Sequence, residues 1–282
     1  MTSLFRNVQQ VAYYAKFRPQ YPSELYDFLI EQLAAPPTLA VDVGCGTGQA
    51  TLALAQHFDK VIGIDPSKEQ LDQIIIPPNA NKSSRDQTQI SFQVNDCVNG
   101  LASLEPASVA CITAAQAAHW FDLPQFYAQA NRVLRPGGIL AMWTYGLVNY
   151  ENKDVDRLVN QELYETILGK YWDPRRHFVE QKYKTLPTLE ETLDLSSPKF
   201  VTTRMEDKFE IALHCTPAEL IGYLRSWSAY NAYCAEHNGD DDNSDATFVD
   251  PVRDVENYLQ NHRIESIRGT WPVTLVWSRK SL

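Results

Sequence analysis

The stretch VDVGCGTG, residues 41–48, decides the fold of this chain. It begins with apolar residues, as a buried strand does, and residues 49–55 follow with the apolar spacing of a helix. Between the two, Gly44, Gly46 and Gly48 let the backbone take conformations that a side chain forbids, so a ligand can lie against main-chain atoms. The stretch therefore predicts a strand, a ligand-binding turn and a helix in succession.

The spacing of these glycines distinguishes two kinds of nucleotide-binding turn. A dinucleotide-binding turn has the pattern G-x-G-x-x-G, whereas this chain has D-x-G-x-G-x-G, with Asp42 two residues before the first glycine. This pattern resembles the first motif of the class I S-adenosylmethionine (SAM) dependent methyltransferases, in which the turn holds the methionine end of the cofactor. The resemblance implies SAM as cofactor and S-adenosylhomocysteine as product. We expect Asp42 to orient the turn and the cofactor amine through hydrogen bonds.

Each of the next two predicted strands ends at or near an acid. Residues 61–65 form an apolar strand that ends at Asp65. A carboxylate in that position can accept both ribose hydroxyls of an adenosine-type ligand. Residues 90–94 form a third strand shortly before Asp96, and the family resemblance places an acid there against the adenine amino group.

Two further strands extend the same alternation of strands and helices. Residues 109–113 form a fourth strand that leads to Gln116, which we expect at the cofactor site. Residues 139–143 form a fifth strand that leads to Tyr145, which we expect at the substrate site. The chain is therefore predicted to be an α/β protein with the class I methyltransferase, Rossmann-like fold. This fold has a seven-stranded, mostly parallel sheet with an antiparallel last strand, here joined by a helical cap.

The regular alternation of strands and helices stops after the fifth strand. Residues 1–36 are predicted to form an N-terminal lid and helix, and residues 37–145 the SAM-binding core. Residues 146–270 are predicted to form a helical cap and substrate region, with one sheet strand near residues 206–213, and residues 271–282 the final core strand. The cap is expected to contain three helices, at about residues 152–169, 217–233 and 251–261.

Composition and charge exclude several classes of function. The formal net charge is −10 and the pI is about 5.1, which disfavours a nucleic-acid surface rich in Lys and Arg. The five cysteines are scattered without a C-x-x-C pair, so neither a disulfide framework nor a zinc site is expected, and the histidines show no metal-ligand spacing. No apolar run approaches the about 18 residues of a membrane span. We expect a cytoplasmic protein that binds no metal, membrane or nucleic acid.

Four passages narrow the resemblance to one subfamily. Residues 14–22, 114–122, 183–187 and 224–230 are similar to conserved segments of the trans-aconitate methyltransferase-like proteins. The resemblance spans most of the chain. It implies a small-molecule acceptor, in the best understood members the carboxylate of a compact polyacid.

The chemistry of the acceptor determines which residues the reaction needs. A carboxylate is already ionised at neutral pH and needs no general base, whereas a phenol or hydroxyl acceptor needs one. His119 is then the candidate base, because it follows the fourth strand. The alternative is that His119 and Trp120 form an aromatic wall of the substrate pocket. Arg18 is expected to bind the cofactor carboxylate, unless it forms a surface ion pair.

Several other side chains could bind the substrate. The guanidinium of Arg225 can bind a carboxylate through two parallel hydrogen bonds, with a solvated helix face as the alternative. Tyr14 and Phe17 are expected to fold over the site, and Trp227 to line the substrate pocket or pack within the cap. Residues 175–177, Arg-Arg-His, form the densest positive cluster of the cap, which an anionic substrate could use or water could simply solvate.

The sequence leaves other functions open. The leading hypothesis is O-methylation of a carboxylic acid, and the first alternative is methylation of a phenol, hydroxyl or amine. A SAM-binding regulatory protein without turnover is a second alternative, and the intact glycine turn with both acids argues against it. The glycine spacing disfavours a nicotinamide dehydrogenase, and the acidic pI disfavours RNA or protein as substrate. A monomer and a homodimer are equally compatible with the sequence.

Overall fold

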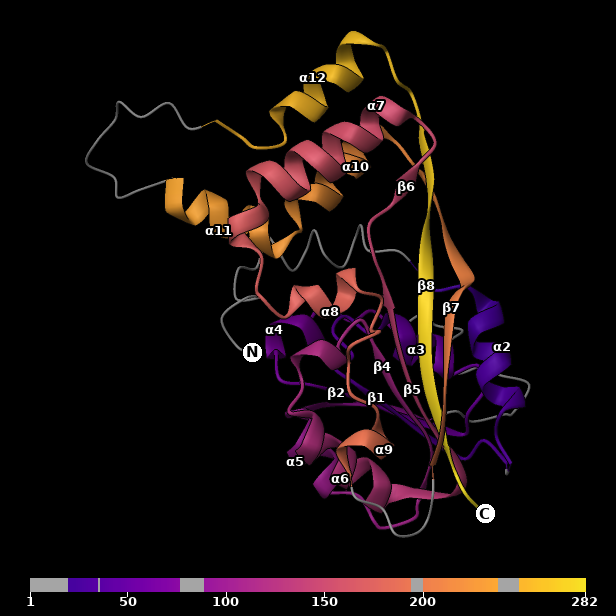
Figure 1. Cartoon of the computed structure of the whole chain (residues 1–282). Coiled ribbons are helices and arrows are strands. Elements are labelled where there is room, and N and C mark those ends of the chain that lie inside the picture. The colour runs from indigo at the N-terminus through magenta and orange to yellow at the C-terminus, as the bar shows by residue number, and fades with distance from the viewer. Residues whose placement is uncertain (1–19, 35, 77–88, 194–199, 238–248) are drawn as a thin grey trace.

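The computed structural model describes residues 20–34, 36–76, 89–193, 200–237 and 249–282 (Figure 1). This part of the chain folds around one twisted sheet, with helices on both faces and a group of helices above one end. Within it, none of the helices combines the length and the apolar character needed to cross a membrane.

The sheet has eight strands in the order β3-β2-β1-β4-β5-β8-β6, and β7 pairs with the other edge of β8. Strands β1 to β5 run parallel and β8 is antiparallel to its neighbours, which confirms the predicted arrangement. The strand not predicted is β6, a two-residue segment that continues along β8 on the side of β5. The strands are β1 Leu39–Val43, β2 Lys60–Asp65, β3 Gln89–Val94, β4 Val109–Ala115, β5 Leu134–Tyr145, β6 Asn149–Tyr150, β7 Phe200–Cys215 and β8 Ile267–Lys280.

Both faces of the central parallel strands β1, β2, β4 and β5 are buried, whereas the edge strand β3 is partly exposed. Alternate side chains of a strand point to opposite faces, so Ala40 belongs to the core layer under α2 and α3, and Val41 to the layer under α5 and α6. The helices around the core are α2 Ser23–Glu31, α3 Gln49–Leu54, α4 Lys68–Leu71, α5 Cys97–Ala102, η1 Ala118–Trp120, α6 Leu123–Val133, α8 Arg176–Glu180 and α9 Leu189–Thr192.

The helices of the cap differ from their predicted bounds. The first predicted helix consists of one α-helical turn followed by a π-helix, in which the amide of Leu168 donates to the carbonyl of Leu163. The second breaks after Arg225, where the hydroxyl of Ser226 donates to the carbonyl of Tyr223 and competes with the helical ladder. The cap helices are α7 Lys153–Asp156, η2 Arg157–Ile167, η3 Gly169–Tyr171, α10 Pro217–Arg225, α11 Ser228–His237 and α12 Arg253–Asn261.

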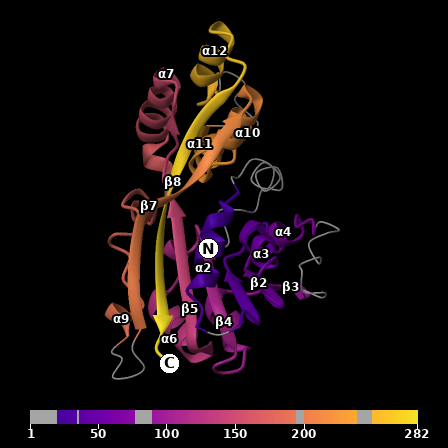
Figure 2. The ribbon, with the colours of Figure 1, turned by 90° about the vertical axis from the view of Figure 1, so that its right-hand side faces the viewer.

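Two long strands join the core to the cap. Strands β7 and β8 pair over most of their lengths and run from the sheet up into the cap helices (Figure 2). The first half of β7 was missed because residues 200–208 alternate with charged and polar residues, as an edge strand does, and form no apolar run. The carboxyl ends of the parallel strands point toward the cap (Figure 1), where ligands bind in doubly wound folds.

Candidate functional site

The glycine turn lies between β1 and α3, at the carboxyl edge of the sheet. Gly44, Gly46 and Gly48 all have positive φ, at 67°, 56° and 85°. A Cβ on Gly44 would lie 2.6 Å from the Cβ of Ala117, and one on Gly46 would lie 2.9 Å from Oε1 of Gln70. Glycine is therefore required at Gly44 for both its backbone conformation and its lack of a side chain.

Asp65 stands beside this turn at the end of β2. Its Oδ2 accepts the amide of Gly46 at 2.8 Å, and its Oδ1 accepts the amide of Ser67 at 2.8 Å. Burial raises the pKa of Asp65, and the two amide hydrogen bonds oppose that shift. Each carboxylate oxygen can accept a second hydrogen bond, so contact with ribose hydroxyls remains a prediction that this position allows.

Asp42 lies in the interior of the protein, beneath the glycine turn. Its side chain is fully buried, and its two oxygens accept the hydroxyls of Thr51 at 2.6 Å and Thr113 at 2.7 Å. Burial raises the pKa of Asp42 to about 6. The predicted contact with a cofactor amine does not fit a carboxylate without exposed surface, so Asp42 supports the turn from below by joining α3 and β4 to β1.

Asp96 caps the first turn of α5. Its Oδ1 accepts the amides of Val98 and Asn99, both at 2.8 Å, and its Oδ2 accepts Nδ2 of Asn99 at 2.7 Å. The amide of Asn99 lowers the pKa of Asp96, so the carboxylate is charged at neutral pH. The side chain is accessible, and its contact with an adenine amino group remains a prediction.

Gln116 connects the carboxyl ends of β4 and β5. Its Nε2 donates to the carbonyl of Tyr145 at 3.0 Å, and its Oε1 accepts the amide of Tyr145 at 3.0 Å and the hydroxyl of Thr144 at 2.6 Å. The residue has a positive φ of 53°, a conformation that is uncommon in residues other than glycine. Both polar atoms of the side-chain amide therefore bond to β5, and Nε2 keeps a second hydrogen, so the expected cofactor contact stays a prediction.

His119 lies in η1, directly after β4, and is 5% exposed. Its Nδ1 lies 2.9 Å from the hydroxyl oxygen of Tyr183, and its ring packs against Trp120 with 4.8 Å between the ring centroids. Burial, and then the positive charges of Arg176 and Arg175, lower the pKa of His119 to about 3. The imidazole is therefore neutral at physiological pH.

Comparisons with known proteins agree with this geometry. A sequence profile described as a methyltransferase domain matches residues 41–142, which hold the glycine turn, both acids and β4. A Dictyostelium discoideum protein named as a methyltransferase is 36% identical over 231 residues, covering 80% of this chain and 78% of that protein. The chain belongs to the class I SAM-dependent methyltransferases.

Two more relatives extend the similarity beyond the core. A Saccharomyces cerevisiae protein named as a SAM-dependent methyltransferase is 27% identical over 270 residues and matches 90% of each chain. A solved structure described as a type II methyltransferase from Anaeromyxobacter dehalogenans superposes with a TM-score of 0.71 at 33% identity. It covers 93% of this chain and 98% of its own. The cap is therefore part of the shared fold.

The carboxyl edge of the methyltransferase fits the cofactor that its family implies. The glycine turn exposes main chain at its three glycines, and Asp65 and Asp96 stand at or just after the ends of the next two strands. Thr47, within the turn, has a buried hydroxyl without a hydrogen-bond partner among the described residues. A buried hydroxyl in that state is expected to find a partner when a polar ligand binds.

Two predicted substrate residues have their partners within the cap. Trp227 is 4% exposed and packs edge-on against Tyr164, with 5.7 Å between the ring centroids, so the cap-packing alternative describes it better than a pocket wall. Arg225 pairs with Asp250 at 2.8 Å and lies 3.9 Å from Glu256. Its guanidinium is therefore engaged by the cap's own carboxylates and does not stand free for a substrate.

Tyr145 is nearly buried as well, at 3% exposure. Its ring lies 6.1 Å from that of Tyr21 and 6.1 Å from that of Trp271, so it forms part of the aromatic layer between sheet and cap. The remaining predicted residues, Tyr14, Phe17 and Arg18, lie outside the described residues.

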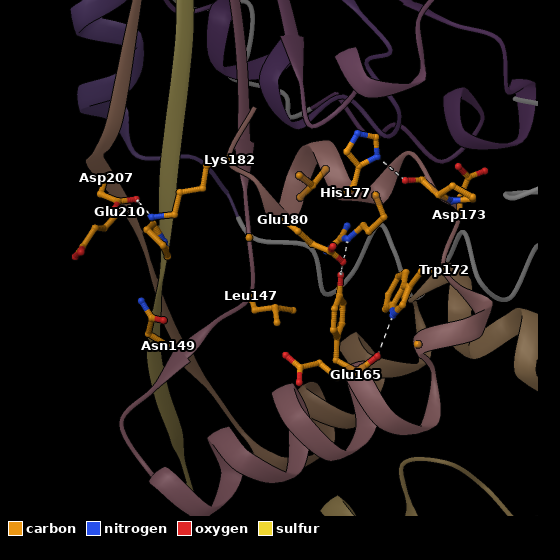
Figure 3. Close-up of a pocket in the computed structure, with 17 residues that line it drawn as sticks. Leu147, Asn149, Glu165, Trp172, Asp173, His177, Glu180, Lys182, Asp207 and Glu210 are labelled. Atoms are coloured by element: carbon orange, nitrogen blue, oxygen red, sulfur yellow. Dashed lines mark hydrogen bonds and ion pairs between the residues drawn. The ribbon is translucent and has the colours of Figure 1, made fainter. Parts of the chain in front are cut away.

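A cavity of about 760 Å³ opens between the end of β5, η2, α8 and β7 (Figure 3). In Figure 3, Leu147 lies between the ion pair of Lys182 with Asp207 on the β7 side and Trp172 on the side of the cap. Neither the glycine turn nor His119 lines this cavity. Its volume lies within the range of about 300–1,000 Å³ that is usual for small-molecule sites.

Arg175, which precedes α8, and Arg176, its first residue, differ in their partners. Arg175 pairs with Asp173 at 3.0 Å and lies 4.5 Å above the ring of Trp120. Arg176 lines the cavity and lies 5.0 Å from the ring of Trp172. Its Nε donates to the hydroxyl of Tyr164. Among the described residues, no carboxylate oxygen lies within 4.0 Å of the guanidinium nitrogens of Arg176. The sequence marked this positive cluster but could not distinguish the paired from the unpaired arginine.

Proposed function

We propose that this methyltransferase O-methylates the carboxylate of a small-molecule acid. The methyl of SAM is already activated on a sulfonium, so the protein has mainly to position the acceptor in line with it. The observation that carries the proposal is the neutral, buried His119 at the end of β4, the position predicted for a general base.

A histidine in that state is poorly suited to remove a proton from a phenol or an alcohol. Proton transfer is most efficient when the pKa of the base lies near the working pH, and burial lowers the pKa of His119 to about 3. An acceptor that is ionised before it binds, such as a carboxylate, does not need this base.

Arg176 is the cation that we propose for binding the acceptor. It lines the cavity beside β5, and Nε is the one guanidinium nitrogen for which the described residues supply a hydrogen-bond acceptor. A guanidinium binds a carboxylate through two parallel hydrogen bonds, an arrangement that Lys cannot supply. Arg225 was expected to have this role from the sequence, but it forms an ion pair with Asp250 in the cap. It therefore serves as the control for Arg176.

The test is transfer of a labelled methyl group from SAM to a panel of small acids, phenols and amines, with trans-aconitate among the acids. We expect a base-labile product from an acid. The Arg176→Gln variant should raise the KM for that acid about tenfold, the value of one charged hydrogen bond. The Arg225→Gln variant should leave KM nearly unchanged.

Other outcomes would overturn the proposal in distinct ways. The cavity is also lined by three glutamates, Glu165, Glu180 and Glu210. Methyl transfer to an amine in place of an acid would indicate that the cavity binds a positively charged acceptor. Transfer to a phenol, lost in a His119→Asn variant, would make His119 a base. Tight SAM binding without transfer to any panel member would favour a regulatory protein.

A further inference from the structure

Tyr164, on η2, hydrogen-bonds to two side chains of α8 that line the cavity. Its hydroxyl oxygen lies 3.0 Å from Nε of Arg176 and 2.6 Å from Oε1 of Glu180 (Figure 3). A guanidinium can only donate a hydrogen bond, and an ionised carboxylate can only accept one. The hydroxyl of Tyr164 therefore accepts from Arg176 and gives its own hydrogen to Glu180, so the direction of both bonds is fixed.

Tyr164 is itself held in place by the cap. The residue is buried, and its ring packs against Trp172, with 4.6 Å between the ring centroids, and edge-on against Trp227. Nε1 of Trp172 also donates to the backbone carbonyl of Tyr164 at 3.1 Å. The rings of Tyr164 and Trp172 lie 5.7 Å and 5.0 Å from the guanidinium carbon of Arg176. Packing on these rings and the bond at Nε together fix the orientation of this guanidinium.

The bond at Nε leaves one edge of the Arg176 guanidinium available. A guanidinium can bind a carboxylate through two parallel hydrogen bonds, either from Nε with one Nη or from the two Nη nitrogens. Tyr164 occupies Nε, and the described part of the chain supplies no hydrogen-bond acceptor for Nη1 or Nη2. A carboxylate in the cavity therefore has the Nη1–Nη2 edge to bind.

The Tyr164 hydroxyl also separates Arg176 from Glu180. The two residues are four positions apart on α8, a spacing at which oppositely charged side chains of a helix can pair directly. They do not pair here, because Glu180 accepts from Tyr164 instead. A direct pair would have charge-assisted hydrogen bonds, and it would place a carboxylate of the protein where the carboxylate of an acceptor has to bind.

We propose that Tyr164 is a positioning residue that keeps Glu180 from pairing with Arg176 and so leaves the Nη1–Nη2 edge open to the acceptor carboxylate. This role rests on the proposed function, because it takes Arg176 as the group that binds the acceptor. Loss of the hydroxyl frees Nε of Arg176 and the carboxylate of Glu180 at the same time. The two can then form an ion pair that competes with the acceptor.

The kinetic test measures KM and kcat for the acid acceptor with and without the charge of Glu180. Tyr164→Phe should raise KM about fivefold with kcat nearly unchanged, because acceptor binding is what the ion pair opposes. In a Glu180→Gln background, the same Tyr164→Phe change should raise KM by less than about twofold, since glutamine cannot form that ion pair. An equal rise of KM in both backgrounds would show a structural effect of the lost hydroxyl and would overturn the proposal.

Tyr258→Phe is the matched control for these variants. It removes another hydrogen bond between a tyrosine hydroxyl and a carboxylate of the cap, from Tyr258 to Oδ2 of Asp154 at 3.0 Å. Neither of these two residues lines the cavity. Tyr258→Phe should therefore leave KM unchanged, and a rise equal to that of Tyr164→Phe would assign the effect to the cap as a whole.

A structural test needs neither SAM nor an acceptor. In crystal structures of the full chain, we expect the Tyr164 hydroxyl between Arg176 and Glu180 in the wild type. In Tyr164→Phe, a carboxylate oxygen of Glu180 should lie within about 4 Å of a guanidinium nitrogen of Arg176. If the two side chains stay apart in Tyr164→Phe, the proposal is wrong. If they pair but no acid is methylated, the separation by Tyr164 is upheld and the proposed function fails.

Discussion

The buried carboxylate of Asp42 should make the stability of this protein depend on pH in a defined window. Two threonine hydroxyls hydrogen-bond it, and burial raises its pKa from 3.8 to about 6. Asp42→Asn is the perturbation of choice because asparagine has nearly the same shape and no charge. The threonine hydroxyls can also accept hydrogen bonds, so they can bond to either residue.

The sign and size follow from the difference between the folded and unfolded pKa. Between pH 3.8 and about 6 the folded protein holds a proton that the unfolded chain has lost, so the free energy of unfolding falls as pH rises. The slope is about 1.4 kcal/mol per pH unit, which gives a loss of about 3 kcal/mol across the window. Above pH 6 both states are ionised and this contribution is constant. The Asp42→Asn variant has no carboxyl at this position, so its free energy of unfolding does not fall for this reason.

The measurement is urea unfolding followed by tryptophan fluorescence at several pH values for both proteins. Other ionisable groups affect both proteins alike, so the difference between the two unfolding free energies isolates Asp42. We expect this difference to change by about 3 kcal/mol between pH 4 and 6.5 in favour of Asp42→Asn, and then to level off. Parallel curves across the whole range would show that burial does not perturb this carboxyl, and would refute the reasoning.

Three further predictions concern the carboxyl edge of the sheet. Asp65→Ala should weaken SAM binding about tenfold or more, because it removes a hydrogen-bonding anion beside the glycine turn; an unchanged affinity by calorimetry would contradict the site. Gly44→Ala should lower stability by about 1–3 kcal/mol through its positive φ and its clash with Ala117. Gly146→Ala, with no atom within 4 Å of the added Cβ, is the control in thermal melts. The profile of kcat/KM for a carboxylate acceptor should show no ionisation from His119 between about pH 5 and 8, and a step near pH 6.5 would contradict its lowered pKa.

The core of the fold was predictable because its signals are local. Apolar runs, the glycine spacing and the acid at the end of a strand are each read within a few residues of Gly44 or Asp65, and the parallel sheet follows from their order. The cap was less predictable. The break between α10 and α11 depends on a hydrogen bond from Ser226, a residue that helices also tolerate.

The candidate site shows the same limit. Arg225 and Arg176 look alike in the sequence, and their difference depends on whether Asp250 or an open cavity lies beside the guanidinium. The contact of Tyr183 with His119 joins residues 64 positions apart in the chain, so no spacing rule could pair them. Sequence patterns indicate which helix or strand carries a reactive side chain, whereas the partner of that side chain depends on tertiary packing.

Strand β8 has a consequence for how the protein is made. It follows every other described strand in the chain, yet it lies between β5 and β7 and pairs with both. During synthesis, β5 and β7 must therefore emerge from the ribosome with unpaired edges, which invite pairing with other chains. The sheet and the cap are then completed in the same late step, when β8 inserts between β5 and β7. We expect the nascent chain to depend on chaperones until that strand is available.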